Sequence, residues 1–437
     1  MQECRRRESS QRRYCAPMPA SIRAEPAPAA VRLDPALVVV LGGVCAALHL
    51  SKLPPAVTAL QQALGLTLVQ AGFLLSLVQF AGMCVGLAFG ALVDVLGLKR
   101  SMLAGLGVLT LAGAAGGAAR DVPMLMLLRA LEGLGFLLTV LPGPALIRRL
   151  VGAGRVSRVL GLWGAYVPAG AALSLLVGPL VISALGWRLW WWALAALSGA
   201  MALWLARAVP ALSAAPGGSA QGADALGWAA RLARTLGAPG PWLVGVTFAM
   251  YSGQWLAVVG FLPAIYTEAG IGAAATGVLT AVVAAMNISG NVGAGRLLQR
   301  GRSAPRLLAI GFGTMALCAL AAFVGTPAGP LLPALLRYAA VLLYSAAGGL
   351  IPATLFYLAV RLAPGEAMLG STVGWVQQWS SFGQFGGPPL VAAVATYAGG
   401  WQYTWVATGA CALVGLVLTA ALAARLRRLP RAHPGPA

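Results

Sequence analysis

The stretch that decides the fold runs from Ala36 to Val57 and reads ALVVVLGGVCAALHLSKLPPAV. A helix rises ~1.5 Å per residue, so this stretch is long enough to cross the ~30 Å hydrocarbon core of a bilayer. Its only ionisable side chains besides the thiol of Cys45 are those of His49 and Lys52, both near its second end. The sequence therefore predicts a membrane-spanning helix that carries a positive charge within the apolar layer.

Apolar stretches of the same kind follow along the rest of the chain, separated by short polar connections. The predicted spans are 36–57, 68–92, 101–119, 123–146, 159–183, 187–208, 240–265, 272–296, 305–326, 330–358, 368–395 and 401–425. Charged residues make up 9% of the chain, against about 25% in soluble domains. The sequence thus predicts an all-α integral membrane protein with twelve transmembrane helices, whose solvent is a lipid bilayer.

The net charge of +20 could suggest a nucleic-acid partner, but the basic residues are not gathered in one domain. They lie in alternate connections between the spans, at 99–100, 148–158, 207–234, 296–306 and 425–431. Basic connections face the cytoplasm in membrane proteins. We therefore expect no nucleic-acid partner, and a multi-pass protein of the cell inner membrane with both termini cytoplasmic.

The two halves of the chain echo each other. Leu160-Gly161 recurs as Leu369-Gly370, and Gly178-Pro179 recurs at the same spacing as Gly387-Pro388. This repeat predicts two pseudo-symmetric six-helix bundles with a substrate site between them. The predicted parts are a disordered cytoplasmic tail (1–33), an N-terminal bundle (34–208), a cytoplasmic linker (209–239), a C-terminal bundle (240–428) and a C-terminal tail (429–437).

The connection between the second and third spans reads GALVDVLGLKR at residues 90–100. It resembles the signature loop of the major facilitator superfamily, and RALEGLG at 129–135 is similar to that family's Arg-x-x-x-Gly motif. The resemblance covers about 34–428 and implies a transporter that alternates between two states. It also implies a gating role for the loop, in which the acid caps a neighbouring helix and pairs with Arg when the inner gate is closed. The residues matching the loop are Gly90, Asp94, Gly97, Lys99 and Arg100.

Within the family, the chain looks most like the cyanate and nitroimidazole permease branch. The segments that carry this resemblance are KLPP at 52–55, LWG at 162–164 and GFLP at 260–263. The chain departs from the family pattern at 293–300, where the loop equivalent to 90–100 has no acid. A second, symmetric lock on the cytoplasmic side is therefore in doubt.

The candidate functional charges inside the predicted spans are His49, Lys52, Arg129, Glu132 and Arg337. A cation at the bilayer centre costs roughly 2.5–3.5 kcal/mol, so such groups face a cavity or a partner. Counting residues places Lys52, Arg129 and Arg337 at similar depths, and their charge exceeds that of Glu132. We expect Lys52, His49, Arg129 and Arg337 to contact a small anionic solute. If protons drive the cycle, Glu132 is the expected carrier, with His49 as the alternative.

Two other interpretations of these charges stay open. Arg129 and Glu132 lie three residues apart and could form an internal ion pair that only stiffens its helix. Lys52 could extend its ammonium group to the outer interface. Uncharged contacts are expected from Tyr251, Gln254, Trp255, Gln377 and Gln378, although such side chains more often form hydrogen bonds between helices.

Other function classes fit the sequence less well. Two His residues and unpaired Cys spacings predict no metal site and no cofactor. No catalytic cluster points to an enzyme, and the short tails do not favour a transporter-like sensor. We expect a monomer that carries a small molecule, with a proton as the candidate coupling ion. An exporter of lipophilic compounds is the alternative, and neither solute identity nor transport direction follows from the residues.

Overall fold

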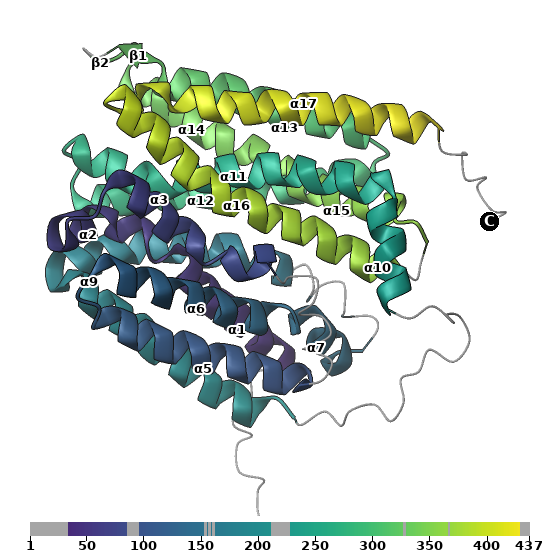
Figure 1. Cartoon of the computed structure of the whole chain (residues 1–437), viewed down its shortest axis with the longest axis horizontal. Coiled ribbons are helices and arrows are strands. Elements are labelled where there is room, and N and C mark those ends of the chain that lie inside the picture. Colours follow the sequence, from purple (N-terminus) through teal and green to yellow (C-terminus); the bar gives the residue numbers. More distant parts are fainter. Residues whose placement is uncertain are drawn as a thin grey trace, which may run out of the picture. The chain divides into compact units, whose positions relative to one another are not determined.

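The structure is a computed structural model that describes residues 34–84, 96–152, 155, 159, 162–210, 228–326, 329–365 and 368–428. The predicted tails, together with Gly90 and Asp94 of the predicted gating loop, lie outside the described residues. Almost all of the described chain is helical (Figure 1).

The helices of the first half follow the predicted spans closely. They are α1 (Pro35–Ser51), η1 (Pro54–Ala56), α2 (Val57–Leu64), α3 (Leu68–Leu77), α5 (Leu98–Gly117), α6 (Val122–Val140), α7 (Gly143–Leu150) and α9 (Tyr166–Ala208). Within α9 the backbone turns sharply at Gly186, where φ is 82° and ψ is 162°. This left-handed φ suits glycine, which has no Cβ, and it divides α9 into the two predicted spans.

The second half repeats this arrangement. Its helices are α10 (Trp228–Gly237), α11 (Pro239–Glu268), α12 (Ala273–Gln299), α13 (Ala304–Phe323), α14 (Ala334–Gly348), α15 (Leu350–Leu362), α16 (Leu369–Ala398), η3 (Trp401–Tyr403) and α17 (Thr404–Arg428). Two short strands, β1 (Gly325–Thr326) and β2 (Gly329–Pro330), pair antiparallel between α13 and α14.

The predicted fold class is confirmed. Eight of the described helices are long and apolar enough to cross a membrane, and α9 alone runs through two predicted spans. The sequence reading missed α10, which lies inside the segment predicted to be a linker. It also missed the breaks within single spans, between α1 and α2 and between α14 and α15.

The break in the first span has a local cause. Pro54 and Pro55 lack backbone N–H groups, so they cannot donate to the carbonyls of Leu50 and Ser51 four residues earlier. Helix α1 therefore ends at Ser51, and a single 3₁₀ turn leads into α2. The ending leaves the last carbonyl groups of α1 without intrahelical partners inside the membrane.

At its other end α1 is capped by Asp34, whose carboxylate accepts a hydrogen bond of 3.0 Å from the backbone N–H of Ala36. Arg155 forms an ion pair with the same carboxylate. The hydrogen bond from Ala36 and the charge of Arg155 together hold the pKa of Asp34 below its usual value. The ion pair with Arg155 connects the start of α1 to the segment before α9.

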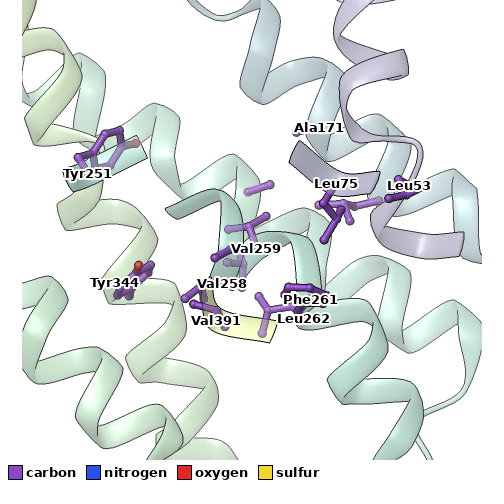
Figure 2. Packing of buried hydrophobic residues seen from close by; sticks show 14 of the residues in the cluster. Leu53, Leu75, Ala171, Tyr251, Val258, Val259, Phe261, Leu262, Tyr344 and Val391 are labelled. Carbon is purple, nitrogen blue, oxygen red and sulfur yellow. The ribbon is translucent and has the colours of Figure 1, made fainter. Parts of the chain in front are cut away.

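The two halves meet through α3 against α16 and through α9 against α12. At the end of the bundle where α2 lies, called here the α2 end, apolar side chains of both halves form one cluster. Figure 2 shows part of this cluster, including Leu53 and Leu75 from the first half and Val259, Phe261 and Val391 from the second. The α2 end is therefore held closed by apolar contact.

Two glycines allow backbones of opposite halves to approach at this end. A Cβ on Gly72 would lie 2.9 Å from the carbonyl oxygen of Pro388 and 2.9 Å from Cα of Pro389. A Cβ on Gly277 would lie 2.9 Å from the carbonyl oxygen of Leu176. Backbone atoms cannot swing aside, so these positions accept only glycine while the halves are in contact.

Replacing Gly72 with Ala is therefore expected to weaken the closed α2 end. Gly107→Ala is the matched control, because a Cβ on that helical glycine would meet nothing within 4 Å. A cysteine introduced in place of the fully buried Leu53 should react faster with a maleimide in the Gly72→Ala background than in the control. Equal reaction rates at position 53, read by mass spectrometry, would contradict the steric argument.

Candidate functional site

Four of the predicted site residues form one buried cluster, called here the charge cluster: His49, Lys52, Arg129 and Glu132. His49 is in the last turn of α1, Lys52 follows that helix, and α6 carries the other two. The four side chains are 0 or 1% exposed. The cluster lies inside the first half, because α5 and α9 also border it through Gly113 and Trp191.

Glu132 is shared by two cations. One carboxylate oxygen accepts a hydrogen bond from Nζ of Lys52, and the other lies 2.8 Å from Nη1 of Arg129. The Lys52 ammonium also sits 4.7 Å from the ring centroid of Trp191, a favourable cation–π distance. With His49 neutral, the charge cluster carries one net positive charge. The sequence left open that Arg129 and Glu132 form an ion pair by themselves. In the structure they do not, because Lys52 shares the carboxylate.

Arg129 also binds the backbone of two other helices. Its Nη2 donates to the carbonyl of Leu50 at 2.8 Å, its Nε to that of Leu74 at 3.2 Å, and its Nη1 to that of His49. These carbonyls belong to the last turns of α1 and α3, where helix breaks leave them without intrahelical partners. Unpaired backbone groups are costly in lipid. Arg129 thus stabilises the breaks in both spans.

His49 links the charge cluster to the second part of α9. Its Nε2 lies 2.6 Å from the hydroxyl oxygen of Ser198, and its Nδ1 lies 3.9 Å from a Glu132 oxygen. Among the described residues, Nδ1 has no hydrogen-bond partner. The imidazole is therefore placed to exchange a proton with the cluster, while Ser198 fixes its orientation.

A second buried cluster, called here the amide cluster, lies in the other half. Asn287 donates to the hydroxyl of Tyr251 at 3.0 Å, Trp255 donates to Ser345 at 3.2 Å, and Tyr344 lies 3.5 Å from Gln254. Sequence reasoning named Tyr251, Gln254 and Trp255 as site residues but not Tyr344 or Ser345. Both could have been found from the sequence, because they are polar residues within the predicted tenth span.

Of the two predicted glutamines, Gln378 lies where the halves meet. Gln378 donates to the carbonyl of Met83 across the contact between α16 and the segment after α3, at 2.7 Å. Gln377 is exposed. Beside them, Gln79 donates to Gln384 at 3.0 Å, so a side-chain pair also crosses the contact. Gln79 was missed because it is one polar residue within an apolar span.

The structure does not bring Arg337 to the charge cluster. It is half-buried, and its Nε donates at 2.8 Å to the carbonyl of Ala322 in the last turn of α13. In the gating loop, Gly97 has a left-handed φ of 81°, and Lys99 donates to the carbonyl of Val209 at 2.6 Å. Arg100 is exposed. Lys99 thus satisfies a carbonyl where α9 ends.

The described residues contain no group of three or more His, Cys, Asp or Glu that could hold a metal ion. The arrangement offers instead one buried carboxylate with two cations, a nearby imidazole, and a separate set of amides and hydroxyls. Such groups can bind a solute and move a proton.

Comparison with known proteins gives a family match. Residues 39–388 match the model of the Major Facilitator Superfamily. No curated protein sequence matches the chain. Neither result bears on the cyanate and nitroimidazole permease branch, which stays a prediction.

Several solved transporter structures share the fold at low sequence identity. A bacterial homologue of the human lysosomal transporter Spinster, inward-facing and unoccupied, has a TM-score of 0.72 at 15% identity over 92% of this chain and 99% of that one. The nucleoside transporter NupG gives 0.70 at 14%, covering 89% and 100%. A D-xylose–proton symporter gives 0.69 at 17%, covering 88% and 96%.

The charge cluster makes a prediction about stability. Glu132→Gln should lower the free energy of unfolding by about 3–5 kcal/mol, because it leaves two buried cations without a counter-charge. Lys52→Gln should cost less, because the Arg129–Glu132 pair remains. Adding Lys52→Gln to Glu132→Gln should recover part of the loss. Thermal unfolding of the four proteins in one detergent tests this, and strictly additive effects would contradict the ion-pair assignment.

Proposed function

The chain belongs to the major facilitator superfamily, and on that premise we propose that it is a secondary transporter that carries a small anionic solute across the inner membrane by alternating access. Membrane transport follows from the family and the fold. The observation that supports an anionic solute is the charge inside the spans. Of the described residues, Glu132 is the only carboxylate that does not lie at a helix end.

The described spans thus offer a cationic solute no carboxylate that is not already paired. Glu132 is already held by Lys52 and Arg129, and the three groups together leave one positive charge. Charges interact strongly in a low-dielectric region, so this excess attracts an anion and repels an organic cation. A small anion would neutralise the cluster.

Of the two cations, Lys52 is the one that can turn to a solute. Arg129 is fixed by three backbone carbonyls as well as by Glu132. Lys52 is held by one carboxylate oxygen and a ring, and it precedes Leu53, which packs in the apolar cluster at the α2 end. Separation of the halves there would remove the cover from Lys52. The ammonium group would then be available in one state only, as a transport site requires.

We place the α10 end of the bundle, which is opposite the α2 end, in the cytoplasm. Basic residues gather at the helix ends on that side, and examples are Lys99, Arg148, Arg231, Arg296 and Arg425. The positive-inside rule assigns such an end to the cytoplasm. The closed α2 end then faces outward, and the predicted six-helix halves are the units that move.

Uptake into proteoliposomes tests the solute class. The purified protein should accumulate at least one member of a panel of labelled small carboxylates and inorganic anions, and no organic cation. Lys52→Gln should abolish that uptake, because the mobile cation is lost. Arg337→Gln is the matched control: it removes one arginine charge from a helix end outside the charge cluster and should leave uptake nearly unchanged. Equal losses in both variants would show that Lys52 has no special role.

We further propose that a proton drives the cycle through Glu132. Protonation of this carboxylate would release Lys52 for the solute, so proton binding and anion binding favour each other. His49 Nδ1, 3.9 Å away, is placed to deliver the proton.

With the anion that the wild type accumulates, an acidic exterior should raise accumulation in the wild type. Glu132→Gln should still exchange internal for external anion but should not respond to the pH gradient. The exchange measurement is the control that the variant is folded and binds. Gradient-driven accumulation by Glu132→Gln would place the proton pathway elsewhere.

A further inference from the structure

Helix α10 has a two-sided pattern that the transport cycle does not use. Its sequence is WAARLARTLG, from Trp228 to Gly237. Leu232 and Leu236 lie four residues apart on one face, and Arg231 and Arg234 lie three apart on another. Short helices with separate apolar and basic faces lie in the interface plane of a membrane. Arg234 is exposed, and no described carboxylate pairs with either arginine.

Hydrogen bonds fix α10 to the first turns of two membrane helices. The hydroxyl groups of Thr235 and Ser371, at the start of α16, lie 2.7 Å apart. Nε1 of Trp242, in the first turn of α11, donates to the carbonyl of Leu236 at 2.8 Å. Figure 1 shows α10 beside the start of α16. The helix therefore has a fixed depth relative to both spans.

Trp242, which is exposed in the first turn of α11, indicates what that depth is. Trp242 packs on Trp375 with ring centroids 4.8 Å apart and on Trp379 at 5.7 Å, and the last two are 6.0 Å apart. Tryptophan gathers at membrane–water interfaces, with its ring at the level of the lipid headgroups. A helix hydrogen-bonded to Trp242 therefore lies near the headgroups. Arg231 and Arg234 are then at the level of the lipid phosphates.

We propose that α10, with the first turns of α11 and α16, binds the headgroup of an anionic phospholipid of the inner leaflet. The guanidinium groups of Arg231 and Arg234 donate to the phosphodiester oxygens, and the tryptophan rings pack against the adjoining acyl chains. The site rests on the proposed cytoplasmic position of α10. It does not depend on which solute is carried.

Binding there would act on the contact between the halves. The helix that Thr235 holds, α16, carries Gln378 and Gln384, whose side chains bond to Met83 and Gln79 across that contact. A headgroup that fixes α10 also fixes the start of α16. Anionic lipid would thus favour the state in which these bonds form.

Native mass spectrometry of the full chain, titrated in detergent with phosphatidylglycerol or phosphatidylcholine, tests the site. The wild type should retain phosphatidylglycerol in preference to phosphatidylcholine, and phosphatidylglycerol should slow deuterium exchange in residues 228–237. Arg231→Gln with Arg234→Gln should weaken retention roughly 30-fold, the effect expected for two basic residues at a charged surface. The corresponding double Lys variant should retain the lipid, because a point charge suffices for a phosphate.

The matched control, Arg296→Gln with Arg300→Gln, removes two exposed arginines. One is in the last turn of α12 and the other directly follows that helix. It should retain phosphatidylglycerol almost as the wild type does. Equal weakening in the two Gln variants would show only general attraction to a basic surface and would overturn the proposal. Displacement of the lipid by millimolar inorganic phosphate would do the same, since the site would then bind a small free anion.

Discussion

The structure of the first half depends on how backbone carbonyls inside the membrane find donors. The two prolines after Leu53 end α1 early, and α3 ends in mid-membrane as well. In lipid no water can satisfy the carbonyls left over. Arg129 donates to three of them, two on α1 and one on α3. An arginine at this depth is costly unless it is paired, so it requires Glu132 one turn further along α6. The broken helices, the arginine and the carboxylate are therefore parts of one arrangement.

That arrangement accounts for the different properties of the two cations. Arg129 is fully occupied by fixed acceptors, whereas Lys52 shares one oxygen of Glu132 and rests on Trp191. Lys52 lies at the break itself, directly before Leu53, which belongs to the apolar contact at the α2 end. Separation of the halves there would remove the second half from Leu53, the residue next to Lys52. A group whose surroundings differ between two states can couple binding to the change of state. Arg129 keeps the helix ends in place while this happens.

Sequence reasoning predicted the spans and the depth of the charges, because hydropathy and residue spacing determine both. It predicted similar depths in the membrane for His49, Lys52, Arg129 and Glu132, and in the structure these four side chains lie together. It did not predict which face each residue occupies, since the crossing of helices depends on packing between distant segments. Arg337 shows this: counting residues gave it the depth of Arg129, yet it donates to the carbonyl of Ala322 at a helix end. The helix breaks and α10 were also missed. A proline pair or a short amphipathic segment changes the local hydropathy little, whereas the spans were predicted from long apolar stretches.

Arg129 and Arg337 differ in their surroundings. Both arginines donate to carbonyls at helix ends. Among the described residues, only Arg129 is joined by a carboxylate and a lysine. The second half has neutral groups at its centre, where Asn287 donates to the hydroxyl of Tyr251 and to the carbonyl of Ser345. The buried ion pairs among the described residues thus lie in one half, while the centre of the other offers hydrogen bonds between neutral groups. On the proposed function, the first half would attract an anionic solute by charge and the second half would orient it by hydrogen bonds. Substitutions among the neutral groups of the second half would then change solute specificity without disturbing the ion pairs that hold the first half together.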